Sequence, residues 1–222
     1  MPNSVYLYLL ILILLLWLDY KRGKRHIYNQ IPLGKGNKEE VKIKKLLTLF
    51  SFIFRYYTIT DVLFRNLSNK STQIDHILLT RKNIYIIESK NIKGYISGYR
   101  EEQTWINKYD KTNYNIMYNP IRQNYGHIKF FQKHIVDIDL ESIVYFNPKV
   151  NIDAKTISEN KEIKVGIFSL LLHIYMTEKN SKIVSSQEDI KYVFDKIQKK
   201  NLSNDTLEIK KHIDYVKEIR RL

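Results

Sequence analysis

The sequence predicts a mixed α/β domain in which a helix, three or more strands, a second helix and a further strand follow one another. The first observation is a helical periodicity of apolar residues after residue 36. The second is a series of short β-like stretches between residues 57 and 107, and the third is Pro120, which is well placed to open a helix. A hydrophobic content of 44% in 222 residues is sufficient for one packed core.

The N-terminal segment is expected to be a membrane anchor at residues 1–20. The run from Val5 to Leu18 carries no charge, and the basic stretch KRGKRH follows two residues later. Such a helix spans roughly 21 Å, short of the ~30 Å hydrocarbon core, but interfacial Trp17 and Tyr20 extend its reach. No small-residue cleavage site follows, so an anchor is preferred to a signal peptide or an interfacial helix. The positive-inside rule then predicts a cytoplasmic location for the rest of the chain.

A basic linker at residues 21–35 contains Pro32 and two glycines and leads into the first helix of the domain. Asn37 suits the N-cap position of this helix, and Glu39 and Glu40 lie in its first turn. The main folded domain is expected at residues 36–150. A C-terminal region of strands and helices, packed on that domain, is expected at residues 151–222.

The remaining elements follow from local patterns in the sequence. Strands are expected at residues 57–66, 72–80, 84–90, 94–98, 103–107, 142–146 and near 163–167. Helices are expected at residues 120–136, 168–177, 187–199 and 205–221. The Asn- and Tyr-rich segment before Pro120 is expected to be a loop. The last helix has an apolar face with basic groups outside it, which is typical of a helix docked on a domain.

The chain is strongly basic, with 37 Lys and Arg residues against 23 acidic ones and a formal net charge of +14. Such an excess favours a polyanionic partner, either nucleic acid or anionic lipid. AT-rich codons, which also encode Ile, Asn and Tyr, produce the same bias. The absence of cysteine excludes disulfides and thiolate metal sites, and it fits a reducing compartment.

Three charged residues interrupt the apolar hairpin at residues 73–91: Asp75 on its first strand, and Glu88 and Lys90 on its second. Side chains alternate faces with period two, so Glu88 and Lys90 share a face. A two-residue loop at 81–82, or a four-residue loop at 80–83, places Asp75 opposite Glu88 with Cβ atoms roughly 5 Å apart. A loop of odd length without a bulge separates them.

Two adjacent carboxylates repel each other and need a cation, a shared proton or access to solvent. Lys90 supplies one positive charge, and a divalent ion such as Mg²⁺ or Mn²⁺ would supply two while finding the oxygen ligands it prefers. This is the chemistry of metal-assisted phosphodiester hydrolysis, in which the lysine orients the water or neutralises the transition state. On spacing alone, a solvent-facing charge cluster at a strand end is the simpler explanation.

The segment resembles the nuclease-related domain (NERD), a branch of the restriction-endonuclease-like PD-(D/E)xK superfamily. The resemblance covers roughly residues 36–147. It rests on Trp105 and four blocks: GNKEEVKIKKLL, TQIDHILLTRKNIYIIESKNIKGYISG, NPIRQNYGHI and SIVYF. It implies an αβββαβ core, in which a mixed central sheet is flanked by helices.

The resemblance also implies five catalytic positions: Asp75, Glu88, Lys90, Glu40 and Gln123. Of these, Asp75 and Glu88 would bind the metal. Glu39 stands where the family has a second glycine, so the choice between Glu39 and Glu40 stays open. The proline before the aspartate and the glycine of the turn are replaced by Ile74 and Asn83, and neither change removes a metal ligand.

Three further residues have ready structural explanations. His76 is expected on the opposite face of the strand from Asp75, with a structural role. His127 lies one helical turn after Gln123, and a structural role is preferred for it too. Trp105 is expected in the core and not as a base-stacking platform.

The sequence therefore predicts a membrane-anchored, Mg²⁺- or Mn²⁺-dependent nuclease that acts on nucleic acid in the cytoplasm, with DNA the expected substrate and no small-molecule cofactor. The alternative hypothesis is a protein without enzymatic activity: a membrane-tethered nucleic-acid-binding or scaffold protein whose endonuclease-like fold does no chemistry.

Overall fold

The computed structural model describes residues 38–65 and 70–219, which belong to the unit Asn37–Leu222. The predicted membrane anchor and basic linker lie outside the described residues. Within the described ranges, no helix is both long enough and apolar enough to cross a membrane.

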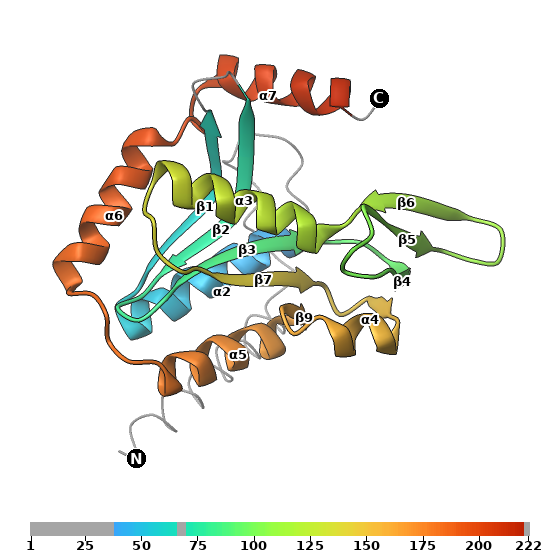
Figure 1. The fold of residues 1–222 in the computed structure, drawn as a ribbon, viewed down its shortest axis with the longest axis horizontal. Coiled ribbons are helices and arrows are strands. Elements are labelled where there is room, and N and C mark those ends of the chain that lie inside the picture. The colour runs from blue at the N-terminus through green and yellow to red at the C-terminus, as the bar shows by residue number, and fades with distance from the viewer. Residues whose placement is uncertain (1–37, 66–69, 220–222) are drawn as a thin grey trace, which may run out of the picture. The chain divides into compact units, whose positions relative to one another are not determined.

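The larger of two mixed sheets has five strands in the order β1-β2-β3-β7-β9 (Figure 1). The first three strands pair antiparallel, and β3–β7 and β7–β9 pair parallel. The predicted order of one helix, three strands, a helix and a strand is present, with three strands of a second sheet inserted before the second helix. The elements are α2 (Lys38–Phe54), β1 (Tyr57–Arg65), β2 (Ser71–Leu79), β3 (Ile84–Lys90), α3 (Pro120–His134), β7 (Glu141–Phe146) and β9 (Ile163–Val165).

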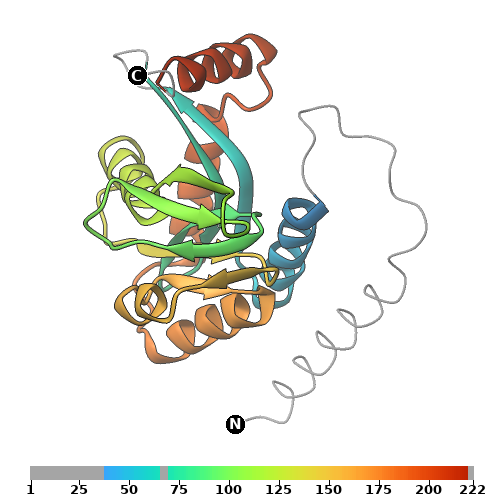
Figure 2. The same ribbon diagram turned by 90° about the vertical axis from the view of Figure 1, so that its right-hand side faces the viewer.

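Helices α2 and α3 cover opposite faces of this sheet (Figures 1 and 2). The apolar periodicity predicted for the first helix corresponds to its buried stripe, which includes Ile43, Leu47 and Phe50. Helix α3 begins where Pro120 occupies its first turn and the Asn119 side chain accepts hydrogen bonds from two backbone N–H groups. Ile128 and Phe131 of this helix join one core cluster with apolar residues of β1, β2 and β3.

The second sheet has the strand order β6-β5-β4-β8 and lies beyond the C-terminal end of β3 (Figure 1). Its strands are β4 (Gly94–Ser97), β5 (Thr104–Lys108), β6 (Tyr114–Tyr118) and β8 (Val150–Ile152). The prediction of a loop before Pro120 is wrong, because that segment contains β6, whose residues pair along the whole of β5. Trp105 is fully buried, which confirms its predicted place in the core.

The C-terminal region adds four helices: α4 (Ala154–Glu159), α5 (Ile167–Asn180), α6 (Gln187–Lys200) and α7 (Thr206–Ile219). Strand β8 and helix α4 were not predicted. Helix α6 contributes Ile197 to the core cluster shared with α3. Helix α7 lies against the ends of β1 and β2, where Glu208 pairs with Arg65 at 2.5 Å and His212 bonds the Ser71 hydroxyl at 2.8 Å.

Candidate active site

The β2–β3 hairpin has the even-length loop that the charge pattern requires. Leu79 pairs with Ile84 and His76 with Ile87, so four residues form the loop. The Thr80 hydroxyl accepts hydrogen bonds from two backbone N–H groups of the turn, at 3.0 and 2.8 Å, which fixes its shape. Continuing the register by one pair brings Asp75 opposite Glu88. The predicted register is therefore confirmed, in its four-residue form.

Asp75 lies where β2 departs from regular pairing with its neighbours. In β1 the residue opposite to it, Asp61, has a φ of 56°, in the left-handed region that few non-glycine residues adopt. On the other side, pairing with β3 stops at His76. The Asp75 carboxylate reaches into this gap, where Oδ2 accepts hydrogen bonds from the Ser89 backbone N–H at 2.8 Å and the Ser89 hydroxyl at 3.1 Å.

Glu88, Lys90 and Gln123 form a connected group between β3 and α3. The Glu88 side chain is buried, with 3% of its surface exposed. The Lys90 ammonium donates to Glu88 Oε1 at 2.5 Å and to Gln123 Oε1 at 2.8 Å. Gln123 reaches the lysine because the Asn119 cap starts α3 one turn earlier. Two residues of β3 and one of α3, all three singled out from the sequence, therefore meet at the end of the strand.

His127 approaches the other oxygen of Glu88. Its Nε2 lies 3.2 Å from Glu88 Oε2, and its Nδ1 bonds the Thr72 hydroxyl at 2.7 Å. Neither Glu88 Oε2 nor His127 Nε2 has a hydrogen-bond partner among the described residues, so the two atoms are neighbours without a hydrogen bond between them. Because His127 lies four residues after Gln123, both side chains project from one face of α3 toward Glu88. Sequence reasoning noted this spacing but gave His127 no contact.

The two carboxyl groups have opposite pKa shifts. Burial, and after it the nearby Glu88 carboxylate, raise the pKa of Asp75 to about 7 against the lowering effects of Ser89 and Lys90. Burial also acts to raise the pKa of Glu88, but Lys90 and then His127 outweigh it and hold that pKa below its usual value. Near neutral pH, Glu88 is therefore ionised while Asp75 is divided between its two forms.

The donor set fits a divalent cation in part. Glu88 lies near enough for its charge to raise the Asp75 pKa, and one buried Glu88 oxygen lacks a hydrogen-bond partner among the described residues. Carboxylate oxygens are ligands that Mg²⁺ prefers. The described residues contain no group of three or more His, Cys, Asp or Glu side chains arranged around a metal. Glu40 lies in α2, but its side chain and that of Glu39 are outside the described residues, so the choice between them stays open.

His76 and Ser89 complete the surroundings of the two carboxylates. His76 is buried with neither ring nitrogen hydrogen-bonded to a described group, and burial lowers its pKa to about 4, so it is neutral. Ser89 was missed because strict alternation places its side chain on the face away from Glu88. Only the break in pairing at Asp75 makes that contact available, and no sequence pattern indicated the break.

The chain is similar in sequence to known proteins. Residues 35–147 match the nuclease-related domain, NERD. The chain is also 26% identical, over 198 residues, to an uncharacterized protein of Bacillus anthracis, and the alignment covers 86% of this chain and 87% of that protein. No solved structure matches. The family match spans half of the chain and contains β1 to β3, α3 and β7, so the chain belongs to the nuclease-related domain (NERD) family.

Proposed function

We propose that this protein is a divalent-metal-dependent nuclease that hydrolyses phosphodiester bonds of nucleic acid, with DNA as the expected substrate. Membership of the nuclease-related family gives the general class. The observation that carries the proposal is the meeting of Glu88, Lys90 and Gln123 beside Asp75 at the end of β3. This is the arrangement expected of a PD-(D/E)xK enzyme with a restriction-endonuclease-like core.

In this proposal Asp75 and Glu88 hold Mg²⁺ or Mn²⁺. The ion, when bound, supplies a Lewis acid for a phosphate oxygen and lowers the pKa of the attacking water. Lys90 is held by Glu88 and Gln123 within reach of the same place, where its charge neutralises the developing phosphorane. Asp75 must lose its proton to act as a ligand, so its pKa of about 7 makes metal binding dependent on pH in the neutral range.

The decisive experiment compares cleavage and binding in the same variants. Asp75→Ala and Glu88→Ala should abolish cleavage, because each removes a ligand, and should leave nucleic-acid binding intact or stronger, because each removes a negative charge. Lys90→Ala should abolish cleavage and weaken binding slightly. Asp195→Ala, which changes an exposed carboxylate on α6, is the matched control and should cleave normally.

The outcome also decides between enzyme and scaffold. The scaffold reading draws support from the close Lys90–Glu88 pair, which already satisfies one carboxylate oxygen without a metal. Cleavage that persists in EDTA, or that survives both carboxylate substitutions, contradicts the site assignment. Binding with no cleavage of single- or double-stranded DNA or RNA, in either Mg²⁺ or Mn²⁺, favours the scaffold.

The location of the protein is a separate proposal. The uncharged run from Val5 to Leu18 and the basic residues after it support a single-pass membrane protein with residues 21–222 in the cytoplasm. Protease added outside intact cells should leave the nuclease-like domain whole. Digestion of that domain in intact cells would show that the orientation is reversed.

A further inference from the structure

One face of the second sheet presents aromatic and apolar side chains to the outside. The exposed fractions are 59% for Tyr114, 67% for Ile116 and 49% for Tyr118, all on β6. The opposite face is buried and includes Ile96 and Trp105. A two-faced sheet normally has polar residues on its open face, so an open face of tyrosine and isoleucine indicates a binding surface.

Cross-strand register arranges this face in rows. Tyr95, Lys108 and Tyr114 are neighbours across β4, β5 and β6. The next row on the same face consists of Ser97, Ile106 and Ile116, and the last pairs Thr104 with Tyr118. Lys108 is the one charged residue in these rows, and it lies between two exposed tyrosines. A phosphate would meet a cation there with an aromatic ring on either side, which suits a nucleotide chain.

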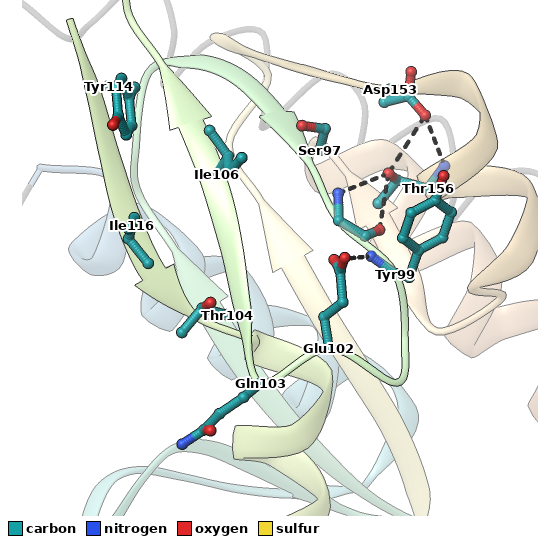
Figure 3. A pocket seen from close by; sticks show the side chains of 11 residues that line it. Ser97, Tyr99, Glu102, Gln103, Thr104, Ile106, Tyr114, Ile116, Asp153 and Thr156 are labelled. Carbon is teal, nitrogen blue, oxygen red and sulfur yellow. Dashed lines mark hydrogen bonds between the residues drawn. The ribbon is translucent and has the colours of Figure 1, made fainter.

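A hollow of about 790 Å³ opens beside these rows (Figure 3). Ile106, Tyr114 and Ile116 gather on one side of it, and Glu102 and Asp153 border the other side. Both carboxylates already accept hydrogen bonds from backbone N–H groups: Glu102 from the loop after β4, and Asp153 from the first turn of α4. Asp153 also accepts a hydrogen bond from the Tyr95 hydroxyl at 2.7 Å, whereas the rows themselves contain no acidic residue.

The outward face of β4, β5 and β6, called the tyrosine face, is connected through the chain to the candidate active site. Tyr118 ends β6, Asn119 caps α3, and Gln123 in the first turn of that helix bonds Lys90. The Asn119 amide also donates to three backbone carbonyls of the loop between β4 and β5, at 2.8 to 3.1 Å. This buried asparagine fixes the base of the hairpin to the helix. Residues 118–123 therefore connect the end of this face to a residue of the candidate site.

We propose that the outward face of β4, β5 and β6 binds an unpaired nucleic-acid strand and guides it to the catalytic group. Bases within a duplex are stacked on their neighbours, so exposed tyrosine rings can stack only on unpaired bases, while Lys108 contacts the backbone. The inference rests on the proposed nuclease function for its choice of ligand class. It adds a substrate class: single strands, or duplexes with unpaired ends.

The test measures binding by the full chain in EDTA, where no metal-dependent cleavage takes place. The double variant Tyr114→Leu/Tyr118→Leu keeps apolar area but removes both rings, and Tyr192→Leu, at an exposed tyrosine of α6, is the matched control. Fluorescence anisotropy follows a labelled oligonucleotide, either single or annealed to its complement. The double variant should bind the single strand about tenfold more weakly or worse and the duplex with less than about a twofold change, and the control should match the wild type.

Equal losses for single strand and duplex, or unchanged single-strand affinity, overturn the inference. A double variant that binds the single strand normally but has lost self-association in sedimentation overturns it as well, because the face is then a protein interface. Far-UV circular dichroism and thermal unfolding establish that the variants are folded. Because binding is measured without metal, a protein that binds single strands through the tyrosines and never cleaves supports this inference and refutes the nuclease. A protein that cleaves nucleic acid, but whose single-strand affinity is unchanged in the double variant, supports the nuclease and refutes this inference.

Discussion

Replacing Asp75 by asparagine should stabilise the metal-free domain at neutral pH. The folded pKa of Asp75, about 7, lies above the ordinary value of 3.8, because burial and Glu88 disfavour the charged form. A group of this kind contributes stability that is fully present below about pH 4 and lost as the pH rises through 7. Asparagine does not titrate, and its side-chain oxygen can still accept a hydrogen bond from Ser89.

The size of the effect follows from the shift in the Asp75 pKa. One pKa unit corresponds to about 1.4 kcal/mol, so the shift from 3.8 to about 7 sets an upper limit of about 4 kcal/mol on the cost of the charged form. Typical domains have a free energy of unfolding of about 5–15 kcal/mol. The Asp75→Asn variant should therefore differ from the wild type by a large share of the total stability at pH 8, and by little below pH 4.

Urea unfolding of residues 21–222 in EDTA, measured at several pH values between 4 and 8, gives this difference directly. The gap between variant and wild type should widen from pH 4 to pH 7 and then stay constant. Mg²⁺ should stabilise the wild type at pH 8 but not the variant, because ligand binding to the folded state raises its stability. A gap that does not change with pH would show that the Asp75 carboxylate is not held in an unfavourable environment, and the reasoning would fail.

Three further outcomes are expected. Glu178→Ala should lower the free energy of unfolding by roughly 3 kcal/mol, because it leaves several buried donors of the β2–β3 turn unpaired; urea denaturation measures it. Gly98→Ala should lower the melting temperature, since its Cβ would lie 2.2 Å from the buried indole of β5, whereas Gly126→Ala, with nothing within 4 Å, should raise stability by about 1 kcal/mol. His127→Leu removes one of the groups that hold the Glu88 pKa down, so the Glu88 pKa should rise; NMR titration of the Glu88 carboxyl carbon in EDTA measures it, and an unchanged pKa would count against that role.

The order of the core elements could be predicted because each carries a local signal. The start of α3 followed from Asn119 and Pro120, and β3 followed from a run of isoleucines between turn residues. Strand β6 could not be predicted in this way. Its outward side chains are Tyr114, Ile116 and Tyr118, so a polar outward face, the usual sign of a half-buried strand, is absent. The exposed apolar side chains that made β6 hard to predict are also the basis of the proposed face for binding a nucleic-acid strand.

The parts of the candidate site that depend on the alternation of side chains between the two faces of a strand could be predicted from the sequence. Period-two alternation and an even loop were enough to predict the register of the hairpin, and the family resemblance added Gln123, which bonds Lys90. The hydrogen bonds from Ser89 to Asp75 depend on a local break in strand pairing, which no periodicity encodes. The approach of His127 to Glu88 depends on how α3 is seated on the sheet, a property of the assembled core.

The contacts of Glu178 show that the candidate site depends on residues outside the segment that the family shares. This buried carboxylate of α5 accepts hydrogen bonds from Thr80, Asn83 and Tyr85 of the hairpin that carries the candidate site, although it lies outside the matched residues 35–147. Strand β9 and Ile197 of α6, also outside the match, complete the large sheet and its core. A chain cut at residue 147 would keep every residue of the candidate site and lose the partners of its hairpin. The segment matched by the family is therefore shorter than the segment needed for a stable fold, and a recombinant domain should extend through α6.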